Sequence, residues 1–207
     1  MAPRALRPVA TVATLAVLVL GGCANWGRGK LNTVGLNRVT LFDFDDPAQV
    51  EAWRPVDDTA TGGQSRSRLV YASPGMAQFA GNVSPKDGGG FASVRADMPD
   101  NAPRDFNGFI LHVRGDGKRY IFYVTTGGED EGCIYQLPFE ASRDKWRDVL
   151  VPVIEFTPSC PGQRRRAGRC PSSADITDIG VMIAEPYDGP FTLEIDYIEI
   201  YSVPSGW

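Results

Sequence analysis

The chain has 207 residues, and 21 lysines and arginines stand against 25 aspartates and glutamates, which gives a formal net charge of −4 at pH 7. This acidic balance excludes a basic nucleic-acid-binding surface over the whole chain, so no nucleic-acid partner is expected. Its length is sufficient for one domain with a substantial hydrophobic core, together with a short N-terminal segment.

The N-terminal segment has the pattern of a bacterial lipoprotein signal. Arg4 and Arg7 precede the apolar run Val9–Leu20, which is shorter than the roughly 20 apolar residues of a membrane-spanning helix. The run ends in Leu-Gly-Gly-Cys, which resembles a lipobox, in which Cys23 would receive a diacylglyceryl group and become the new N-terminus. Plain secretion with an incidental cysteine is the alternative.

This pattern predicts a location and a division of the chain. We expect residues 1–22 to be the signal peptide, 23–38 a lipidated tether and 39–203 a single domain. The domain would face the periplasm, held at the cell envelope by the lipid. Ala24, rather than an aspartate, follows the cysteine, and this favours the outer membrane in a Gram-negative host.

The domain reads as all-β, because short runs of alternating apolar and polar residues follow one another with turn residues between them. Such a pattern is typical of a jelly-roll β-sandwich with eight or more strands. The expected strands are Val39–Phe44, Arg68–Tyr71, Ala77–Val83, Phe91–Ala96, Phe109–Arg114, Tyr120–Thr125, Cys133–Leu137, Trp146–Pro152, Ile179–Ala184 and Phe191–Tyr201.

Two of these strands carry specific expectations. In Phe109–Arg114 the alternation puts His112 on the polar face, where a solvated or locally bonded imidazole is expected. The Asp-Gly pair at 116 and 117 predicts a hairpin to the next strand. In Phe191–Tyr201 the apolar residues change phase, so either a β-bulge lies near Tyr197 or the strand is central and covered on both faces.

A polar and glycine-rich cassette between Trp53 and Arg95 is the candidate binding site. Its glycines permit close backbone approach, and its acidic and hydroxyl side chains bond neighbouring backbone readily. A wide loop whose polar groups bond one another is the alternative interpretation. The candidate residues are Trp53, Asp57, Asp58, Gly62, Gly63, Ser65, Arg68 and Arg95.

The cysteines and acidic residues predict a disulfide and no bound cofactor or metal. In an oxidising envelope Cys160 and Cys170 are the expected pair, closing a short loop that holds four arginines, while Cys133 is expected to be a buried small hydrophobic residue. A zinc site is not expected, since the chain has no Cys-x-x-Cys pair and one histidine. Turn chemistry accounts for the acidic run Asp43–Asp46, with calcium binding as the alternative.

Several motifs, in order along the chain, resemble the NADH:ubiquinone oxidoreductase complex I intermediate-associated protein family. The most specific is Gly-Gly-Phe-Ala-Ser-Val-Arg at 89–95; the others lie at 41–44 with Trp53, 56–65, 79–84, 113–120, 179–184 and 189–196, with a looser match at 146–158. The resemblance implies a galactose-binding-like β-sandwich with no established catalytic centre. It also implies a binding role, because mitochondrial members bind an assembly intermediate of respiratory complex I.

The expected function is therefore a non-enzymatic, lipid-anchored binding or assembly module with a protein partner. Catalysis is not expected, because the acidic pairs, such as Asp57–Asp58, alternate across a strand or sit at turns, and no nucleophile elbow or phosphate loop is present. A carbohydrate-binding module is the alternative. Its aromatic platforms would come from Trp53, Tyr71, Tyr123, Tyr187 and Trp207.

Overall fold

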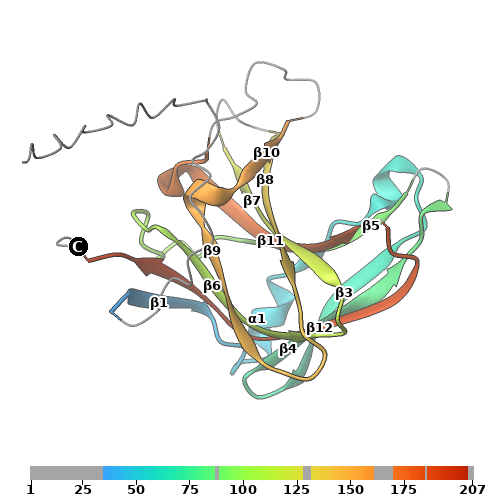
Figure 1. The fold of residues 1–207 in the computed structure, drawn as a ribbon, viewed down its shortest axis with the longest axis horizontal. Helices are drawn as coiled ribbons and strands as arrows, with labels where there is room; N and C mark the ends of the chain where they lie inside the picture. The colour runs from blue at the N-terminus through green and yellow to red at the C-terminus, as the bar shows by residue number, and fades with distance from the viewer. Residues whose placement is uncertain (1–34, 87–88, 128–131, 161–169, 185, 205–207) are drawn as a thin grey trace, which may run out of the picture.

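Two six-stranded antiparallel sheets face each other in the computed structural model, which describes residues 35–86, 89–127, 132–160, 170–184 and 186–204 (Figure 1). Sheet A has the order β3 (Arg66–Ser73), β4 (Met76–Val83), β12 (Gly189–Ser202), β6 (Gly108–Gly115) and β9 (Arg147–Pro152), and β1 (Asn37–Phe42) also pairs with β12. Sheet B has the order β10 (Thr157–Ser159), β8 (Ile134–Glu140), β7 (Arg119–Thr126), β11 (Ile176–Ala184), β5 (Phe91–Asp97) and β2 (Arg54–Pro55). This arrangement confirms the predicted all-β jelly-roll sandwich.

Helical structure in the described residues is short and lies in the connections. The segments are α1 (Ala48–Glu51) and the 3-10 turns η1 (Asp58–Thr61), η4 (Val153–Glu155) and η6 (Ser173–Asp175). No helix in this part of the chain has the length and apolarity needed to cross a membrane. The predicted signal peptide, most of the predicted tether, the 164–169 arginines and Trp207 lie outside the described residues.

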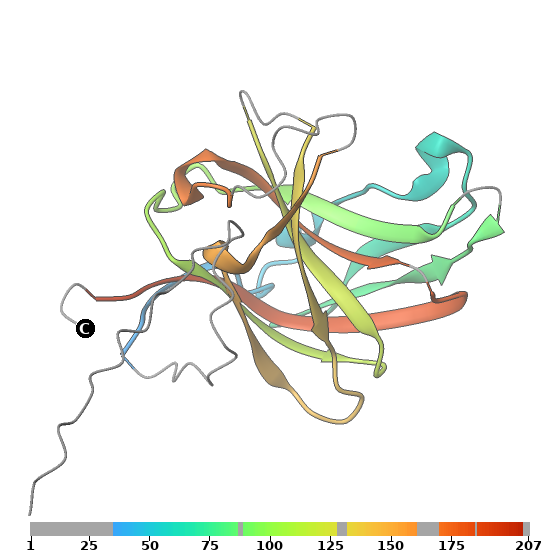
Figure 2. The same cartoon turned by 45° about the horizontal axis from the view of Figure 1, so that its top comes forward.

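The core lies between the inward faces of the two sheets. Side chains from both sheets interdigitate there, and the largest fully buried ones include Phe79, Phe109, Tyr120, Phe122, Tyr135 and Phe156. The turned view in Figure 2 shows the two layers crossing at an angle around this core. Aromatic packing is close: the ring centroids of Phe109 and Phe122, from opposite sheets, are 5.0 Å apart.

β12 is the longest strand and confirms the predicted bulge. Its register with β6 shifts between Ile195 and Tyr197, so Leu193 and Ile195 before the bulge and Ile198 after it all reach the core. The strand is also central, since β6 pairs along one side while β4 and β1 share the other. The bulge alternative is therefore confirmed. The other alternative is not, because the outward side chains of β12, such as Glu194 and Tyr197, are only half-buried and do not lie under a second layer.

The predicted hairpin after β6 is wrong. A turn does follow at Asp116 and Gly117, but it carries the chain from sheet A to sheet B, and β7 pairs with β8 and β11 instead. The inward side chains of β6 and β7, such as Phe109 and Phe122, therefore face each other across the core. Asp116 favours this crossing, because its carboxylate accepts hydrogen bonds from Tyr120 Oη at 2.9 Å and from the Thr192 amide of β12 at 3.1 Å.

The predicted end of the first strand is also wrong. β1 ends at Phe42, because Phe44 adopts a left-handed backbone with φ of 54°, which a strand cannot contain. Gln49 holds this conformation: its side-chain oxygen accepts hydrogen bonds from the Asp43 amide at 3.1 Å and the Phe44 amide at 2.9 Å. The Phe44 ring is thereby fully buried.

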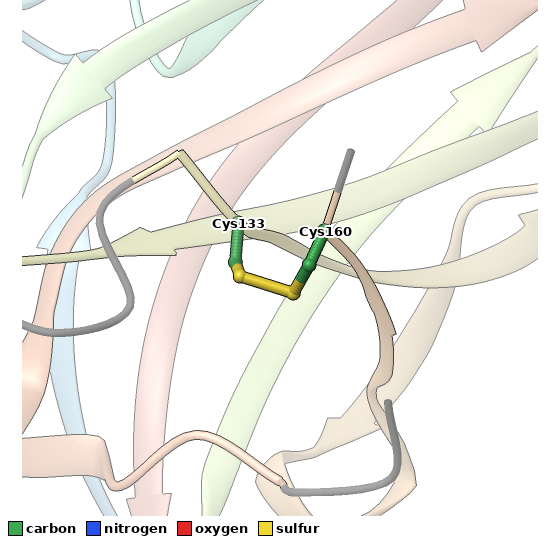
Figure 3. The surroundings of a disulfide bond; sticks show 2 residues. All are labelled: Cys133 and Cys160. Carbon is green, nitrogen blue, oxygen red and sulfur yellow. A yellow bond between two sulfur atoms is a disulfide. The ribbon is translucent and has the colours of Figure 1, made fainter. Parts of the chain in front are cut away.

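The predicted Cys160–Cys170 disulfide is corrected by the structure, in which Cys133 and Cys160 are bonded to each other (Figure 3). The reason is strand pairing. β10 lies antiparallel to β8 with Ser159 opposite Ile134, so the next residues along, Cys160 and Cys133, are also opposite, with Cα atoms 4.3 Å apart. Cys133 is buried, as predicted, but as half of a disulfide.

Candidate functional site

Asp58 of the predicted cassette is a buried hub of hydrogen bonds. Only 1% of its surface is exposed. Its carboxylate accepts hydrogen bonds from the Ser65 amide at 3.0 Å, Ser65 Oγ at 2.6 Å, the Gly90 amide at 2.7 Å and the Phe91 amide at 3.3 Å. Burial opposes ionisation, but the hydrogen bonds from Ser65 and from the Gly90 and Phe91 amides prevail and hold the pKa of Asp58 below its usual range.

Asp57 joins the edges of the two sheets. One carboxylate oxygen accepts the Ser67 amide of β3 at 2.8 Å, and the other accepts the Ser93 amide of β5 at 3.0 Å and Ser67 Oγ at 2.6 Å. β3 is an edge strand of sheet A, and β5 lies next to the two-residue edge strand of sheet B. Asp57 thus supplies acceptors for one amide from each sheet at the place where their edges meet.

The cassette glycines fit around these carboxylates. Gly62 ends η1 with φ of 94°, a conformation that favours glycine. A Cβ atom added to Gly63 would lie 2.3 Å from Asp58 Cγ, so this position needs glycine for the close approach of backbone to carboxylate. Figure 1 shows the turn in teal at the right, beside β5 and far from the C-terminus. We call Asp57, Asp58, Gly63, Ser65 and Ser67 the clasp.

Besides Gly62, which ends η1 beside the clasp, three predicted residues lie outside it. Trp53 packs in the core, with its ring centroid 5.3 Å from that of Phe42. Arg68 is exposed on β3. Arg95 points outward from sheet B, where its Nε lies 3.4 Å from Asp178 Oδ1. The predicted cassette is thus divided: Asp57 and Asp58 bond to groups within it, and Trp53, Arg68 and Arg95 lie elsewhere.

The acidic run Asp43–Asp46 is engaged in turn chemistry. Asp43 Oδ1 accepts hydrogen bonds from the Asp45 amide at 3.2 Å and Gln49 Nε2 at 2.7 Å, and Asp46 Oδ1 accepts one from the Ala48 amide at 2.9 Å. Among the residues that the structure describes, no group of three or more His, Cys, Asp and Glu side chains could hold a metal ion.

A different surface gathers aromatic and charged side chains. His112 points outward from β6, since its neighbours Leu111 and Val113 belong to the core. Its ring is stacked between those of Trp146 and Tyr197, with centroids 5.3 Å and 5.0 Å away and planes within 5° and 11° of parallel. The Arg114 guanidinium lies over the Trp146 ring, 4.9 Å from its centroid.

Strand register places these side chains together. β12, β6 and β9 are neighbours in sheet A, and Tyr197, His112 and Asp148 are opposite one another across them. Arg114 and Glu194 are the next outward pair and form an ion pair. We call this surface the His112 face; its residues are Arg38, His112, Arg114, Trp146, Asp148, Glu194, Asp196, Tyr197 and Glu199.

Asp148 is the electrostatic centre of the His112 face. Its Oδ1 lies 2.7 Å from His112 Nδ1 and accepts a hydrogen bond from Tyr197 Oη at 2.9 Å, while its Oδ2 lies 3.4 Å from an Arg38 nitrogen. Burial opposes ionisation of Asp148, but the bonds from His112, Tyr197 and Arg38 prevail and lower its pKa. Burial and the bond to Asp148 raise the pKa of Tyr197 to about 12.

The sequence indicated only part of this face. Alternation put His112 on the polar side of its strand, and the bonded imidazole confirms that expectation. The phase change in the last strand pointed to Tyr197. Trp146 gave no signal, because its ring reaches His112 only after β9 pairs with β6. Knowledge of which strands are neighbours was the missing information.

Curated relatives are similar in sequence to most of this chain. The chain is 27% identical over 188 residues to "Complex I intermediate-associated protein 30, mitochondrial" of Drosophila melanogaster, covering 80% of this chain and 63% of that protein. It is 27% identical over 186 residues to the mouse protein of the same name, covering 80% and 56%. The chain thus spans between half and two-thirds of the length of these relatives.

Solved structures share the fold. A family 11 carbohydrate-binding module from Clostridium thermocellum, in complex with a β-1,3-1,4-mixed-linked tetrasaccharide, superposes with a TM-score of 0.57 at 17% identity, covering 80% of this chain and 96% of that one. An agarase, of which 25% is covered, gives a TM-score of 0.55 at 12% identity over 81% of this chain. Identities this low show the galactose-binding-like sandwich fold and nothing more.

The family comparison covers nearly the whole sandwich. The family described as "Complex I intermediate-associated protein 30" matches residues 42–195, from the end of β1 to the middle of β12. This range includes the clasp and five of the nine residues of the His112 face. The chain therefore belongs to the complex I intermediate-associated protein 30 family.

Proposed function

We propose that this chain is a non-enzymatic binding module that captures a protein partner during the assembly of a larger complex. The observation that carries the proposal is membership of a family whose members are named for association with an assembly intermediate, over residues 42–195. The clasp supports it: the carboxylates of Asp57 and Asp58 accept several backbone and hydroxyl hydrogen bonds each. These groups serve the fold rather than chemistry on a substrate.

The proposed location is the cell envelope of a bacterium, with the domain held to the membrane by a lipid on Cys23. The lipobox-like sequence before Cys23 supports this. The Cys133–Cys160 disulfide also supports it, because disulfides persist in oxidising compartments. Cys23→Ser is expected to release the protein from membranes into the soluble fraction. Continued membrane retention of this variant would contradict the anchor.

Site-specific photo-crosslinking tests protein capture. A photoreactive phenylalanine analogue would replace Leu150, which points outward from sheet A, or Ile134, which points outward from sheet B, in the full chain in its own cells. We expect one reproducible protein adduct, identified by mass spectrometry, from at least one position. An absence of protein adducts from both faces, with normal protein levels, would contradict the proposal.

Glycan recognition is the second candidate. The specific observation that favours it is a pair of half-buried aromatic residues, Trp146 and Tyr197, on one outward sheet face, since protein surfaces commonly bind sugars by stacking on aromatic rings. Affinity electrophoresis through gels with mixed-linkage β-glucan, and sedimentation with peptidoglycan, test this candidate. Retardation or co-sedimentation that Trp146→Ala abolishes would support it; unchanged mobility and no co-sedimentation would exclude these glycans.

A further inference from the structure

We propose that the His112 face is the docking surface for a lysine- or arginine-rich segment of the protein partner. The inference rests on the proposed function, because it assumes that a protein is bound. It adds the surface that binds this protein and the charge of the segment that is bound. Three properties of the face support it: its aromatic and arginine anchors are held in place, its rings are stacked against one another, and its acidic groups outnumber its arginines.

The anchors are held in place by their neighbours. Tyr197, His112, Trp146 and Arg114 form a continuous stack in which each planar group contacts the next. The stack stands on β12 and β6, two central strands of sheet A, and on Trp146, the residue that precedes β9. Trp, Tyr and Arg supply most of the strongest contacts in protein–protein interfaces, and groups that are already ordered lose little conformational entropy on binding.

The same stacking disfavours a sugar ligand. A pyranose packs its C–H groups on an exposed aromatic face. Here the Tyr197 ring is stacked against His112, and the Trp146 ring contacts both His112 and the Arg114 guanidinium. The stack therefore has less free ring surface than two isolated rings would have, and the charged groups beside it suit hydrogen bonds and ion pairs with a protein.

The charge of the face selects a cationic partner. Four carboxylates, those of Asp148, Glu194, Asp196 and Glu199, stand against the guanidiniums of Arg38 and Arg114. Arg38 is shared between Asp148 and Glu199, and Arg114 pairs with Glu194.

Asp196 is the least engaged of these acids. Its side chain is 42% exposed, and the ion contact recorded for it is 3.9 Å, from its Oδ2 to His112 Nε2. The Asp45 carboxylate adds further negative charge beside Asp196. A Cβ atom built on Gly75 would lie 3.5 Å from Asp45 Oδ1 and 3.7 Å from Asp196 Oδ1, so the two carboxylates border the same point. A lysine or arginine arriving here would meet two carboxylates at the end of the stack.

The experiment is a titration of the full chain with octalysine, followed by NMR, with octaglutamate as the charge-reversed peptide and the mixed-linkage tetrasaccharide as the sugar. We expect octalysine to shift the signals of His112, Trp146 and Tyr197 before those of sheet B, with an affinity that falls as salt is raised. Octaglutamate and the sugar should leave these signals unchanged.

Two variants and a matched control sharpen the result. Asp196→Asn removes one charge from the face and should weaken octalysine binding about threefold to tenfold, and Trp146→Ala should weaken it at least tenfold. Asp97→Asn removes the same charge from the outward side of sheet B, where Asp97 is 78% exposed, and should change affinity less than twofold. Asp196→Asn keeps the test valid if Trp146→Ala fails to fold.

Specific outcomes would overturn the proposal. Equal weakening by Asp97→Asn and Asp196→Asn would mean that octalysine responds to net charge alone, and shifts caused by the tetrasaccharide would assign the face to a glycan. The crosslinking test separates this proposal from the function on which it rests. Adducts from Ile134 alone would keep protein capture and reject the His112 face as its surface, whereas an absence of adducts from both positions would reject protein capture itself.

Discussion

The clasp and the His112 face are both rich in polar residues, but the partners of their hydrogen bonds differ. In the clasp, Asp57 and Asp58 accept bonds from backbone amides of segments distant in sequence, and Asp58 is almost fully buried. In the His112 face, side chains bond and stack with other side chains on a partly exposed sheet. Density of polar residues along the sequence marks the clasp but not the His112 face, and burial with backbone partners identifies the clasp as structural.

This comparison gives different expectations for stability in the two regions. Substitutions in the clasp should lower the free energy of unfolding strongly, because they leave buried donors without acceptors. Substitutions in the His112 face should affect stability weakly and partner binding strongly, because exposed groups regain water. The predictions below test this division.

Asp58→Ala should have the largest effect. It removes the acceptor of four hydrogen bonds, three of them from backbone amides. We expect a loss of about 3 kcal/mol or more of unfolding free energy, measured by urea denaturation. Asp97→Ala, at an exposed position on sheet B, is the control and should cost less than about 1 kcal/mol. Similar losses for both would remove the distinction between the clasp and the surface.

Gly63→Ala should come next. The new Cβ would lie 2.3 Å from Asp58 Cγ, so the carboxylate or the turn must shift. We expect a loss of about 2 kcal/mol in the same urea measurement. Gly127→Ala is the matched control, because its Cβ would make an ordinary 3.4 Å contact with Thr177. A stable Gly63→Ala protein would show that the clasp is not tightly packed.

Trp146→Ala should destabilise the domain by about 1 kcal/mol, through loss of the Arg114 contact and the stacking on His112. Its effect on binding should be the larger one, and thermal unfolding followed by circular dichroism measures the stability part. A loss as large as that of Asp58→Ala would make the stack part of the structural framework, and the comparison would then fail.

The loss of unfolding free energy at acid pH should also differ between the clasp and the His112 face. This difference should be smaller than the effects of the substitutions above. The pKa of Asp58 is lowered in the folded protein, so Asp58 contributes stability above its unfolded pKa of about 4, and this stability is lost as pH falls through the lower folded value. Asp148 has the same sign, but it is partly exposed and its contribution is smaller. Urea unfolding between about pH 5 and 2 should show a shallower decline for Asp58→Ala than for the wild type.

The sequence was sufficient for the sandwich because alternation identifies strands one at a time. Every long strand appeared in the expected place, and the change of phase before Tyr197 correctly indicated the bulge. The two short strands, β2 and β10, were missed, since two or three residues show no period and each strand contains a proline.

The sequence was insufficient wherever the outcome depends on which strands are neighbours. Cys133 and Cys160 pair because β8 and β10 are adjacent, although Cys170 is nearer to Cys160 in sequence. The Asp116 turn crosses between sheets, although its residues are those of a hairpin. The His112 face combines three strands, so no single segment could reveal it.

Amide hydrogen exchange at Ser67 and Ser93 tests the central claim about the clasp most directly. Both amides donate to Asp57, at 2.8 Å and 3.0 Å, in the place where the edges of the two sheets meet. We predict that both exchange slowly in the wild type, at rates similar to core-strand amides, and much faster in Asp57→Ala. Exchange of either amide at the rate of an open loop in the wild type would contradict the claim that this carboxylate holds the two sheets together.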